Sequence, residues 1–255
     1  MSNQDEIAAS ILITNYNGGE LLRRSLQSAF TQDYSSPYEV IVVDDGSTDN
    51  SREIVDEMCQ THLVSHTGHT SPNLKNCATV YHKTNQGIPK SRNAALEAAR
   101  GHIVAWLDSD DKYMPNKLQV STNYLVQYPG VGCVYSDYFE HNKEGKGEEK
   151  RVYKPPFDAK LLMQNCIVSC NSVLFKKVYE KIGEYDNNLP VCEDYDVWMR
   201  IVNAGFSIRH IPMPLFHYYH HGSNVTDTYK MERYMEHNAI AQARARTGQF
   251  YWKNN

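Results

Sequence analysis

The chain has 255 residues, a formal net charge of −4, 41% hydrophobic residues and 22% charged residues. This length suits one large α/β domain or two small ones, and either can bury a sizeable core. Because the net charge is mildly negative, there is no electrostatic case for a nucleic-acid partner, and we expect none. No apolar stretch approaches the roughly 20 residues that span a bilayer, and the acidic start of the chain is unlike a secretory signal.

The six cysteines are scattered, and no two of them form a CxxC pair. We expect reduced thiols rather than a disulfide framework, because the sequence shows no export signal. Three histidines close to two of these cysteines raise the question of a zinc site, but their spacing fits no compact ligand pattern. We therefore interpret residues 62–76 as a surface insertion. The residues in question are Cys59, His62, His66, His69 and Cys77.

The first half of the chain alternates strand and helix signals, which implies a parallel sheet with right-handed crossovers. β-branched runs without polar alternation are typical of strands that helices cover on both faces. We predict strands over residues 7–14, 40–43, 78–83 and 103–107. We predict helices after residue 20, from about residue 50 and over 90–100.

The second half is less regular. We predict helices over residues 115–128, 193–204 and 230–246, and strands over 133–139 and 171–175. The stretch 140–151 is rich in Gly, Lys and Glu, and we interpret it as a solvated hairpin tip or mobile loop rather than a site. The last helix can pack on the domain or on a second copy of the chain, which leaves a homodimer open.

Polar side chains follow each of the four strands predicted in the first half. Ligands of open α/β sheets bind outside the carboxyl ends of the strands. We therefore expect these side chains to converge on one edge of the sheet and to form a binding site. They are Thr14 and Tyr16, Asp44 and Asp45, Asn85 and Gln86, and Asp108, Ser109 and Asp110.

The run from Val104 to Asp111 ends a strand in three carboxylates within four residues. Such a cluster repels itself unless it is solvated, protonated or neutralised by a cation. Its oxygen ligands suit Mg²⁺ or Mn²⁺ bound together with a phosphorylated substrate. The alternative is an acidic turn that caps the next helix. The three other polar strand ends favour the metal site, to which we assign Asp108 and Asp110, and we assign Asp111 to the following turn.

The chain contains neither GxxxxGK[ST] nor GxGxxG, which argues against a P-loop NTPase and a dinucleotide oxidoreductase. Carboxylates could instead bind the base and ribose of a nucleotide, with a divalent ion at its diphosphate. Lys90 and Arg92, at the start of the third helix, could meet phosphate or base there. A solvated helix face is the alternative for both residues.

Several motifs resemble those of family-two inverting glycosyltransferases, which have the GT-A fold. ILITNYNGG, VIVVDDGSTDNS, NQGIPKSRNAALEAARG and VAWLDSDD resemble the nucleotide-binding half of that family. CEDYDVWMRIVNAG resembles its acidic helix, and HYYHHGSNVT its closing Tyr-Arg-x-His segment. The resemblance runs from about Ile7 to Thr226.

This resemblance implies an α/β fold of GT-A type, with a Rossmann-like, largely parallel sheet flanked by helices and a mixed acceptor-binding half. The implied division is a nucleotide-sugar-binding half over residues 1–111 and an acceptor-binding and catalytic-base half over 112–226. A C-terminal helical segment follows over 227–255.

The resemblance also implies roles for individual residues. Asp194 corresponds to the catalytic base, and Glu193 and Asp196 are secondary candidates. Asp110 corresponds to the metal ligand, Asp108 to a ribose or metal contact, and His221 to a contact with metal or diphosphate. Helix N-capping is the alternative for the three acidic residues that begin at Glu193. We assign nucleotide binding to Thr14, Tyr16, Asp44, Asp45, Lys90, Arg92, Asp108 and Ser109.

An inverting transfer is one in-line displacement that needs a single base for the acceptor proton, and a metal can stabilise the leaving diphosphate. No second carboxylic acid is required, unlike in glycoside hydrolysis. We expect Asp194 in the first turn of its helix, where the dipole lowers its pKa and a nearby diphosphate raises it. We expect Asp196 to face elsewhere and to pair with Arg200.

The closing segment departs from the family pattern at Tyr219, which stands where the family has Arg. This removes a cationic contact. His217 and His220 could compensate, but we interpret them as the exposed face of a strand.

These observations predict an inverting glycosyltransferase, dependent on Mn²⁺ or Mg²⁺, that moves a sugar from a nucleoside diphosphate, UDP foremost, to a glycan or glycolipid hydroxyl in cell-surface polysaccharide or glycolipid synthesis. By family analogy we expect a cytoplasmic location, with peripheral docking on the inner face of a membrane as an option. One alternative is a metal-dependent nucleotidyltransferase, against which the lack of a Gly-rich, basic loop counts. The other is an inactive relative that binds nucleotide or glycan.

Overall fold

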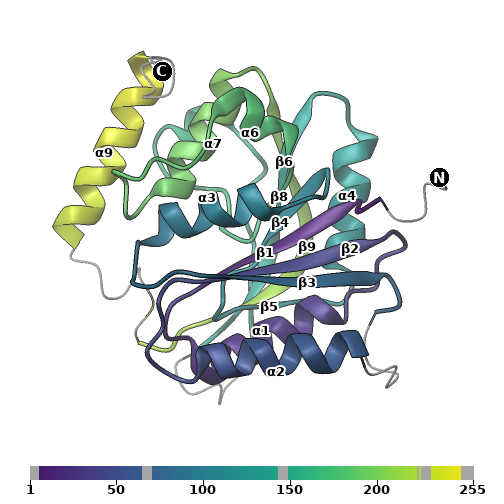
Figure 1. Cartoon of the computed structure of the whole chain (residues 1–255). Helices are drawn as coiled ribbons and strands as arrows, with labels where there is room; N and C mark the ends of the chain where they lie inside the picture. Colours follow the sequence, from purple (N-terminus) through teal and green to yellow (C-terminus); the bar gives the residue numbers. More distant parts are fainter. Residues whose placement is uncertain (1–5, 65–70, 143–148, 223, 225–230, 248–255) are drawn as a thin grey trace.

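The computed structural model describes residues 6–64, 71–142, 149–222, 224 and 231–247. In this part of the chain, nine strands form one sheet with helices on both of its faces (Figure 1). The strands are β1 Ala9–Asn15, β2 Tyr38–Asp44, β3 Leu74–Tyr81, β4 Ile103–Trp106, β5 Lys112–Tyr113, β6 Val131–His141, β7 Lys150–Val152, β8 Val173–Phe175 and β9 Ser207–Tyr219. The helices are α1 Gly19–Phe30, α2 Ser51–Val64, α3 Ile88–Ala98, α4 Lys117–Gln127, α5 Ala159–Leu162, α6 Lys177–Ile182, α7 Glu193–Asn203 and α9 Met231–Thr247.

The sheet is parallel in its first part and mixed in its second. Its strand order is β3-β2-β1-β4-β8-β6-β9-β5, and β7 pairs with β6 at the side. The pairs among β3, β2, β1 and β4 are parallel, whereas β8 is antiparallel to both β4 and β6. β9 is parallel to β6, and β5 is antiparallel to β9. This arrangement confirms the predicted parallel first half and mixed second half.

The apolar runs become central strands because both of their faces are covered. Every residue of β2 is buried. In β1, Ile11 and Ile13 join the core beneath α1 and α2, whereas Leu12 joins the core on the opposite face, with residues of α3 and α7. The period of two along a strand divides its side chains between these two layers.

The predicted elements of the first half are confirmed within a few residues. In the second half a strand was expected around His217, but the 13-residue extent of β9 was not. β9 runs for 13 residues between β6 and β5, yet Pro212 and Pro214 lie within it. Proline is unfavourable in a central strand because it cannot donate to the ladder. Here the pairing of β6 with β9 shifts register on both sides of Asp137, which lies opposite Pro214. These shifts accommodate the prolines within the strand.

The expectation of reduced cysteines is wrong for one pair. Cys59 of α2 and Cys77 of β3 are disulfide-bonded, with 5.6 Å between their Cα atoms. Helix α2 packs against β3, which brings together two residues 18 positions apart. The bond removes both cysteines from any zinc site of the insertion, whose residues 65–70 lie outside the described part of the chain. Cys133, Cys166, Cys170 and Cys192 remain as thiols.

The final helix is confirmed, and it packs on the domain itself. Figure 1 shows α9 beside α7 at one end of the molecule. Arg244 of α9 lies 2.6 Å from the carboxylate of Asp186 and 3.8 Å from that of Asp196. Asp196 also pairs with Arg200, as predicted from their spacing, at 2.8 Å. This buried ion-pair group joins α9 to α7.

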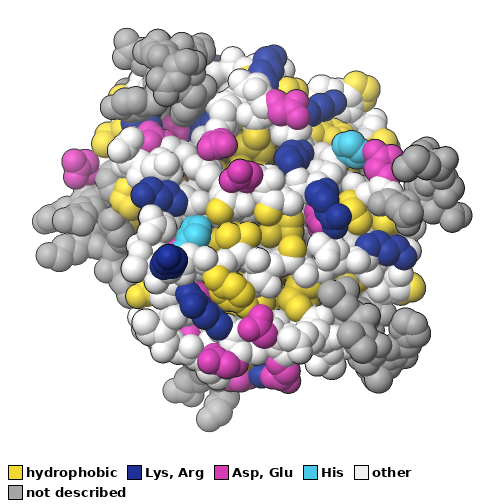
Figure 2. Space-filling view, in the orientation of Figure 1, with side chains coloured by type: hydrophobic (Ala, Val, Ile, Leu, Met, Phe, Trp, Pro, Cys, Tyr) yellow, Lys and Arg dark blue, Asp and Glu magenta, His cyan; other side chains and the backbone are white. Residues whose placement is uncertain are grey.

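The outer surface shown in Figure 2 carries basic and acidic side chains interspersed, without a large field of one sign. Among the described residues, no helix is both long and apolar enough to cross a membrane.

Candidate active site

Asp44 is the last residue of β2 and Asp45 follows it, and both contact the two loops at the edge of the sheet. Asp44 is fully buried, and it accepts hydrogen bonds from Asn15 Nδ2 at 3.0 Å, from the Ser47 backbone N–H at 3.0 Å and from Arg52 Nε at 3.0 Å. Burial alone would raise the pKa of Asp44, but the hydrogen bonds outweigh it and hold the pKa low. The carboxylate thus fixes the loop that leads from β2 to α2.

Asp45 holds the loop before α3. Its Oδ1 lies 2.6 Å from His82 Nδ1 and accepts from the backbone N–H of Gln86, and its Oδ2 accepts from the Gly87 N–H at 2.8 Å. Gly46 has φ +80°, and a Cβ there would lie 2.6 Å from the backbone of Thr84. The two loops therefore lie in close contact, and the predicted role of both aspartates in nucleoside binding stays a prediction.

Three further predicted nucleotide contacts lie at the same edge with less protein around them. Thr14 is half-buried near the end of β1, and the Tyr16 ring is 51% exposed. Asn17, directly after it, adopts a left-handed conformation with φ 54°. Lys90 is exposed, with its Nζ 3.4 Å from Gln86 Oε1. Because its ring is half exposed, Tyr16 offers an accessible aromatic face on which a base can stack.

Arg92 connects the acidic strand end to the helix of the predicted base. Its Nη2 lies 3.4 Å from Asp108 Oδ1, and its Nε lies 3.3 Å from Glu193 Oε1. The guanidinium is buried and lies 5.0 Å from the ring centre of Trp106 and 5.4 Å from that of Tyr185. Burial raises the pKa of Glu193 to about 8 and also raises that of Asp108, while Arg92 opposes both shifts. These carboxylates and aromatic rings hold the Arg92 side chain in place.

Asp110 and His221 are brought together although they lie 111 positions apart in the sequence. His221 Nε2 lies 2.8 Å from Asp110 Oδ2, and Asn224 Nδ2 donates to the same oxygen at 3.4 Å. About a quarter of each of the Asp110 and His221 side chains is exposed, 27% and 21%. Carboxylate and imidazole donors fit a divalent ion such as Mn²⁺. Ser109, half-buried, lies between the two aspartates of the motif.

Asp111 belongs to the interior, and assigning it only to the following turn was wrong. Its carboxylate is fully buried and accepts from Asn171 Nδ2 and from the Tyr219 backbone N–H at 3.3 Å. Asn171 in turn accepts from the Asp108 N–H at 3.0 Å. Burial, followed by Asp110 and Asp108, raises the pKa of Asp111 well above its usual value. Asp111 fixes the acidic segment to the start of β8 and the end of β9.

Asp194 occupies the first turn of α7, as predicted, and is half-buried. Its Oδ1 accepts from the backbone N–H of Tyr195 at 2.7 Å. Cys192, directly before the helix, has φ 62°, a conformation that is costly for a side chain of this type and that occurs often near functional sites. Burial raises the pKa of Asp194, a cause that the expected balance between the helix dipole and a diphosphate left out.

Arg24 was missed by sequence reasoning. It lies on α1, with its guanidinium carbon 3.4 Å from the ring centre of Tyr219, and it donates to the backbone carbonyl of Asp110. A cation therefore lies beside Tyr219, where the family pattern would have Arg. Nothing in the sequence around Arg24 marks it, because the contact depends on the packing of α1 against the end of β9.

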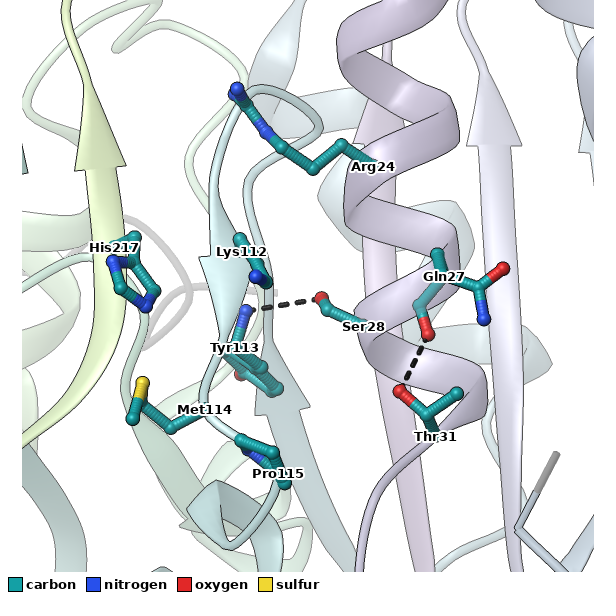
Figure 3. A pocket seen from close by; sticks show the side chains of 9 residues that line it. All are labelled: Arg24, Gln27, Ser28, Thr31, Lys112, Tyr113, Met114, Pro115 and His217. Carbon is teal, nitrogen blue, oxygen red and sulfur yellow. Dashed lines mark hydrogen bonds between the residues drawn. The ribbon is translucent and has the colours of Figure 1, made fainter. Parts of the chain in front are cut away.

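A cavity of about 490 Å³ lies beside the acidic segment rather than at it. Figure 3 shows it between α1 and β9, with β5 behind. Arg24 borders the cavity and also contacts Asp110, so the cavity and the acidic segment share one side chain.

The sequence pattern described as Glycosyl transferase family 2 matches residues 10–183. The chain belongs to this family. The match ends before Asp194 and His221. It therefore covers Arg92 and most of the predicted nucleotide-binding half, but not the predicted base or the closing histidine.

Known proteins resemble the chain over most of its length. The UDP-Glc:alpha-D-GlcNAc-diphosphoundecaprenol beta-1,3-glucosyltransferase WfaP of Escherichia coli is 25% identical, covering 85% of this chain and 79% of that protein. The structure of S. aureus TarS 1–349 in complex with UDP-GlcNAc matches with TM-score 0.70 and 20% identity, covering 92% of this chain and 66% of that one. The mannosyltransferase PcManGT from Pyrobaculum calidifontis, in complex with GDP-Man and Mn²⁺, matches with TM-score 0.67 and 21% identity, covering 95% and 64%.

The structural matches confirm the predicted α/β fold of GT-A type. The chain spans only 31% to 58% of the length of three Rickettsia glycosyltransferases that it matches at 28% to 29% identity.

Proposed function

We propose that this chain is a metal-dependent inverting glycosyltransferase. It moves a sugar from a nucleoside diphosphate, UDP foremost, to a hydroxyl group of a glycan or glycolipid. Its role is in cell-surface polysaccharide or glycolipid synthesis. The observation that carries the proposal is that Arg92 contacts both Asp108 of the acidic segment and Glu193 at the start of α7, while Asp110 of the same segment contacts His221. These contacts link the carboxylates proposed for the diphosphate and its metal to the helical turn that carries Asp194, the proposed base. The similarity to WfaP, whose name gives UDP-Glc, supports UDP as the nucleotide.

Asp194 is the proposed base. It takes the proton of the acceptor hydroxyl while that oxygen bonds to the anomeric carbon from the face opposite the leaving group. The bond from the anomeric carbon to the phosphate oxygen breaks, and its electron pair leaves with the nucleoside diphosphate. Because a single displacement occurs, the anomeric configuration inverts. The raised pKa of Asp194 makes its carboxylate a stronger base than an ordinary aspartate.

Asp108, Asp110 and His221 are the residues that would hold a divalent cation. Bound there, the cation stabilises the charge that develops on the leaving diphosphate. PcManGT, the neighbour solved with Mn²⁺, supports this requirement. Tyr16 and Thr14 lie at the same edge for the nucleoside, and Arg92 holds Asp108 in place by its charge.

A thermal-shift screen of nucleoside diphosphates and nucleotide-sugars, with and without Mn²⁺, tests this proposal. Ligands that bind only the folded chain raise its melting temperature. We expect UDP and UDP-sugars to raise it by several degrees with Mn²⁺ and much less without it. Stabilisation by nucleoside triphosphates but by no nucleotide-sugar would favour a nucleotidyltransferase, and stabilisation without any release of UDP from UDP-sugars would favour an inactive relative.

A further inference from the structure

Three neighbouring strands place two histidines and a glutamate on one face of the sheet, away from the Asp110–His221 pair. Phe139 of β6 lies opposite His217 of β9, so His141, two residues further along β6, faces the same side. The pairing of β6 with β7 brings Glu149, the residue before β7, beside His141. These residues were not expected to form a site: Glu149 lies in the predicted hairpin tip, and His217 was predicted to be exposed.

The prediction of an exposed His217 is wrong, because its side chain is only 13% exposed and faces the other two. His141 Nε2 lies 2.8 Å from His217 Nδ1, and Glu149 Oε2 lies 3.5 Å from the first nitrogen and 3.3 Å from the second. Ligands about 2.0–2.2 Å from a tetrahedral zinc ion lie about 3.3–3.5 Å from one another. Two of the three separations match this value, and the third needs to open by about half an ångström.

One shared proton satisfies the two imidazoles of this arrangement but not the carboxylate that faces them. The two facing nitrogens can share only one proton, because two N–H groups would clash at 2.8 Å. With that proton between the imidazoles, the carboxylate of Glu149 faces the lone pair of a neutral ring. A cation at the centre satisfies all three ligand atoms at once.

The surrounding charges keep both imidazoles in the form that binds metal. Burial lowers the pKa of His141 and of His217, and the nearby cations Arg24 and Lys112 lower both further, while Glu149 acts in the opposite direction. Neutral imidazole is the metal-binding state. The same cations oppose a bound dication, and the carboxylate of Glu149 supplies the compensating negative charge.

We infer that His141, His217 and Glu149 form a zinc site, distinct from the proposed donor site, that ties the β6–β7 hairpin to β9. Two imidazoles and one carboxylate are a ligand set typical of Zn²⁺. The site lies next to the cavity of Figure 3, which His217 borders. The His141 ring also stacks on the Tyr219 ring, with centres 4.4 Å apart, and the Arg24 guanidinium lies over the same Tyr219 ring. Zinc would therefore stabilise the end of β9 that leads to His221.

Zinc binding to the full chain tests this inference. All variants carry Asp110→Ala, which removes the histidine–carboxylate pair of the proposed donor site. Zinc is counted by mass spectrometry after dialysis, and its affinity is measured by competition with a chelator. We expect zinc to bind the Asp110→Ala chain and raise its melting temperature. His141→Ala should lower the bound zinc by one ion per chain, and Glu149→Gln should weaken that site by more than about tenfold. His102→Ala, at an exposed histidine paired with Glu6, is the matched control and should change neither quantity.

Glu149→Gln keeps the size of a side chain that is 40% exposed, so its result stands even where His141→Ala disturbs folding. Equal zinc content and affinity with and without Glu149→Gln would overturn the inference. So would an Asp110→Ala chain that takes up no zinc.

Discussion

Replacing Asp194 with Asn is expected to slow sugar transfer by about 10²- to 10⁴-fold while leaving donor affinity nearly unchanged. The amide keeps the shape of the side chain but cannot take the acceptor proton. Because burial raises the pKa of Asp194, the wild-type rate should fall as the pH drops through a value above that of an ordinary aspartate. Steady-state kinetics across pH, with UDP affinity from calorimetry, measure both effects.

Glu193→Gln is the matched control for this experiment. Glu193 lies beside Asp194 in the same helical turn, but burial raises its pKa to about 8 and its carboxyl group contacts Arg92. We expect it to retain most of the transfer activity. Full activity of Asp194→Asn, or an equal loss in Glu193→Gln, would contradict the assignment of the base.

Replacing Asp110 with Ala is expected to abolish the increase in UDP affinity that Mn²⁺ produces. The substitution removes the carboxylate that faces His221 at 2.8 Å and leaves the imidazole without its anionic partner. UDP affinity measured by calorimetry should then be the same with Mn²⁺ and without it. Asp33→Ala, at an exposed aspartate of the α1–β2 loop, is the control and should keep the Mn²⁺ effect. Unchanged UDP affinity of Asp110→Ala with Mn²⁺ present would refute the metal assignment.

The parallel half of the fold follows from local sequence signals. A strand such as β2, covered on both faces, reads as an uninterrupted β-branched run, and the helices between the strands repeat their apolar residues at helical spacing. Parallel strands also end at a common edge, which is why the sequence alone could place Asp44 and Asp108 at the same edge of the sheet. The mixed half depends on long-range pairing, and β9 with its two prolines carries no such local signal.

Contacts between distant segments account for what was missed at the site. Arg24 reaches Asp110 from a helix whose sequence gives no sign of it, and the disulfide between Cys59 and Cys77 follows from the packing of α2 on β3. The pKa of Asp194 could not be predicted from the helix dipole alone, since its value depends on how deeply the first turn of α7 is buried.

The anomeric configuration of the first product tests the central claim most directly. The chain is incubated with Mn²⁺, with the α-linked UDP-sugar that gives the largest stabilisation, and with water or a glycan hydroxyl as acceptor. ¹H NMR then records the anomeric configuration of the transferred sugar before mutarotation. A single displacement with Asp194 as base predicts that the β anomer forms first. Initial formation of the α anomer would contradict the account.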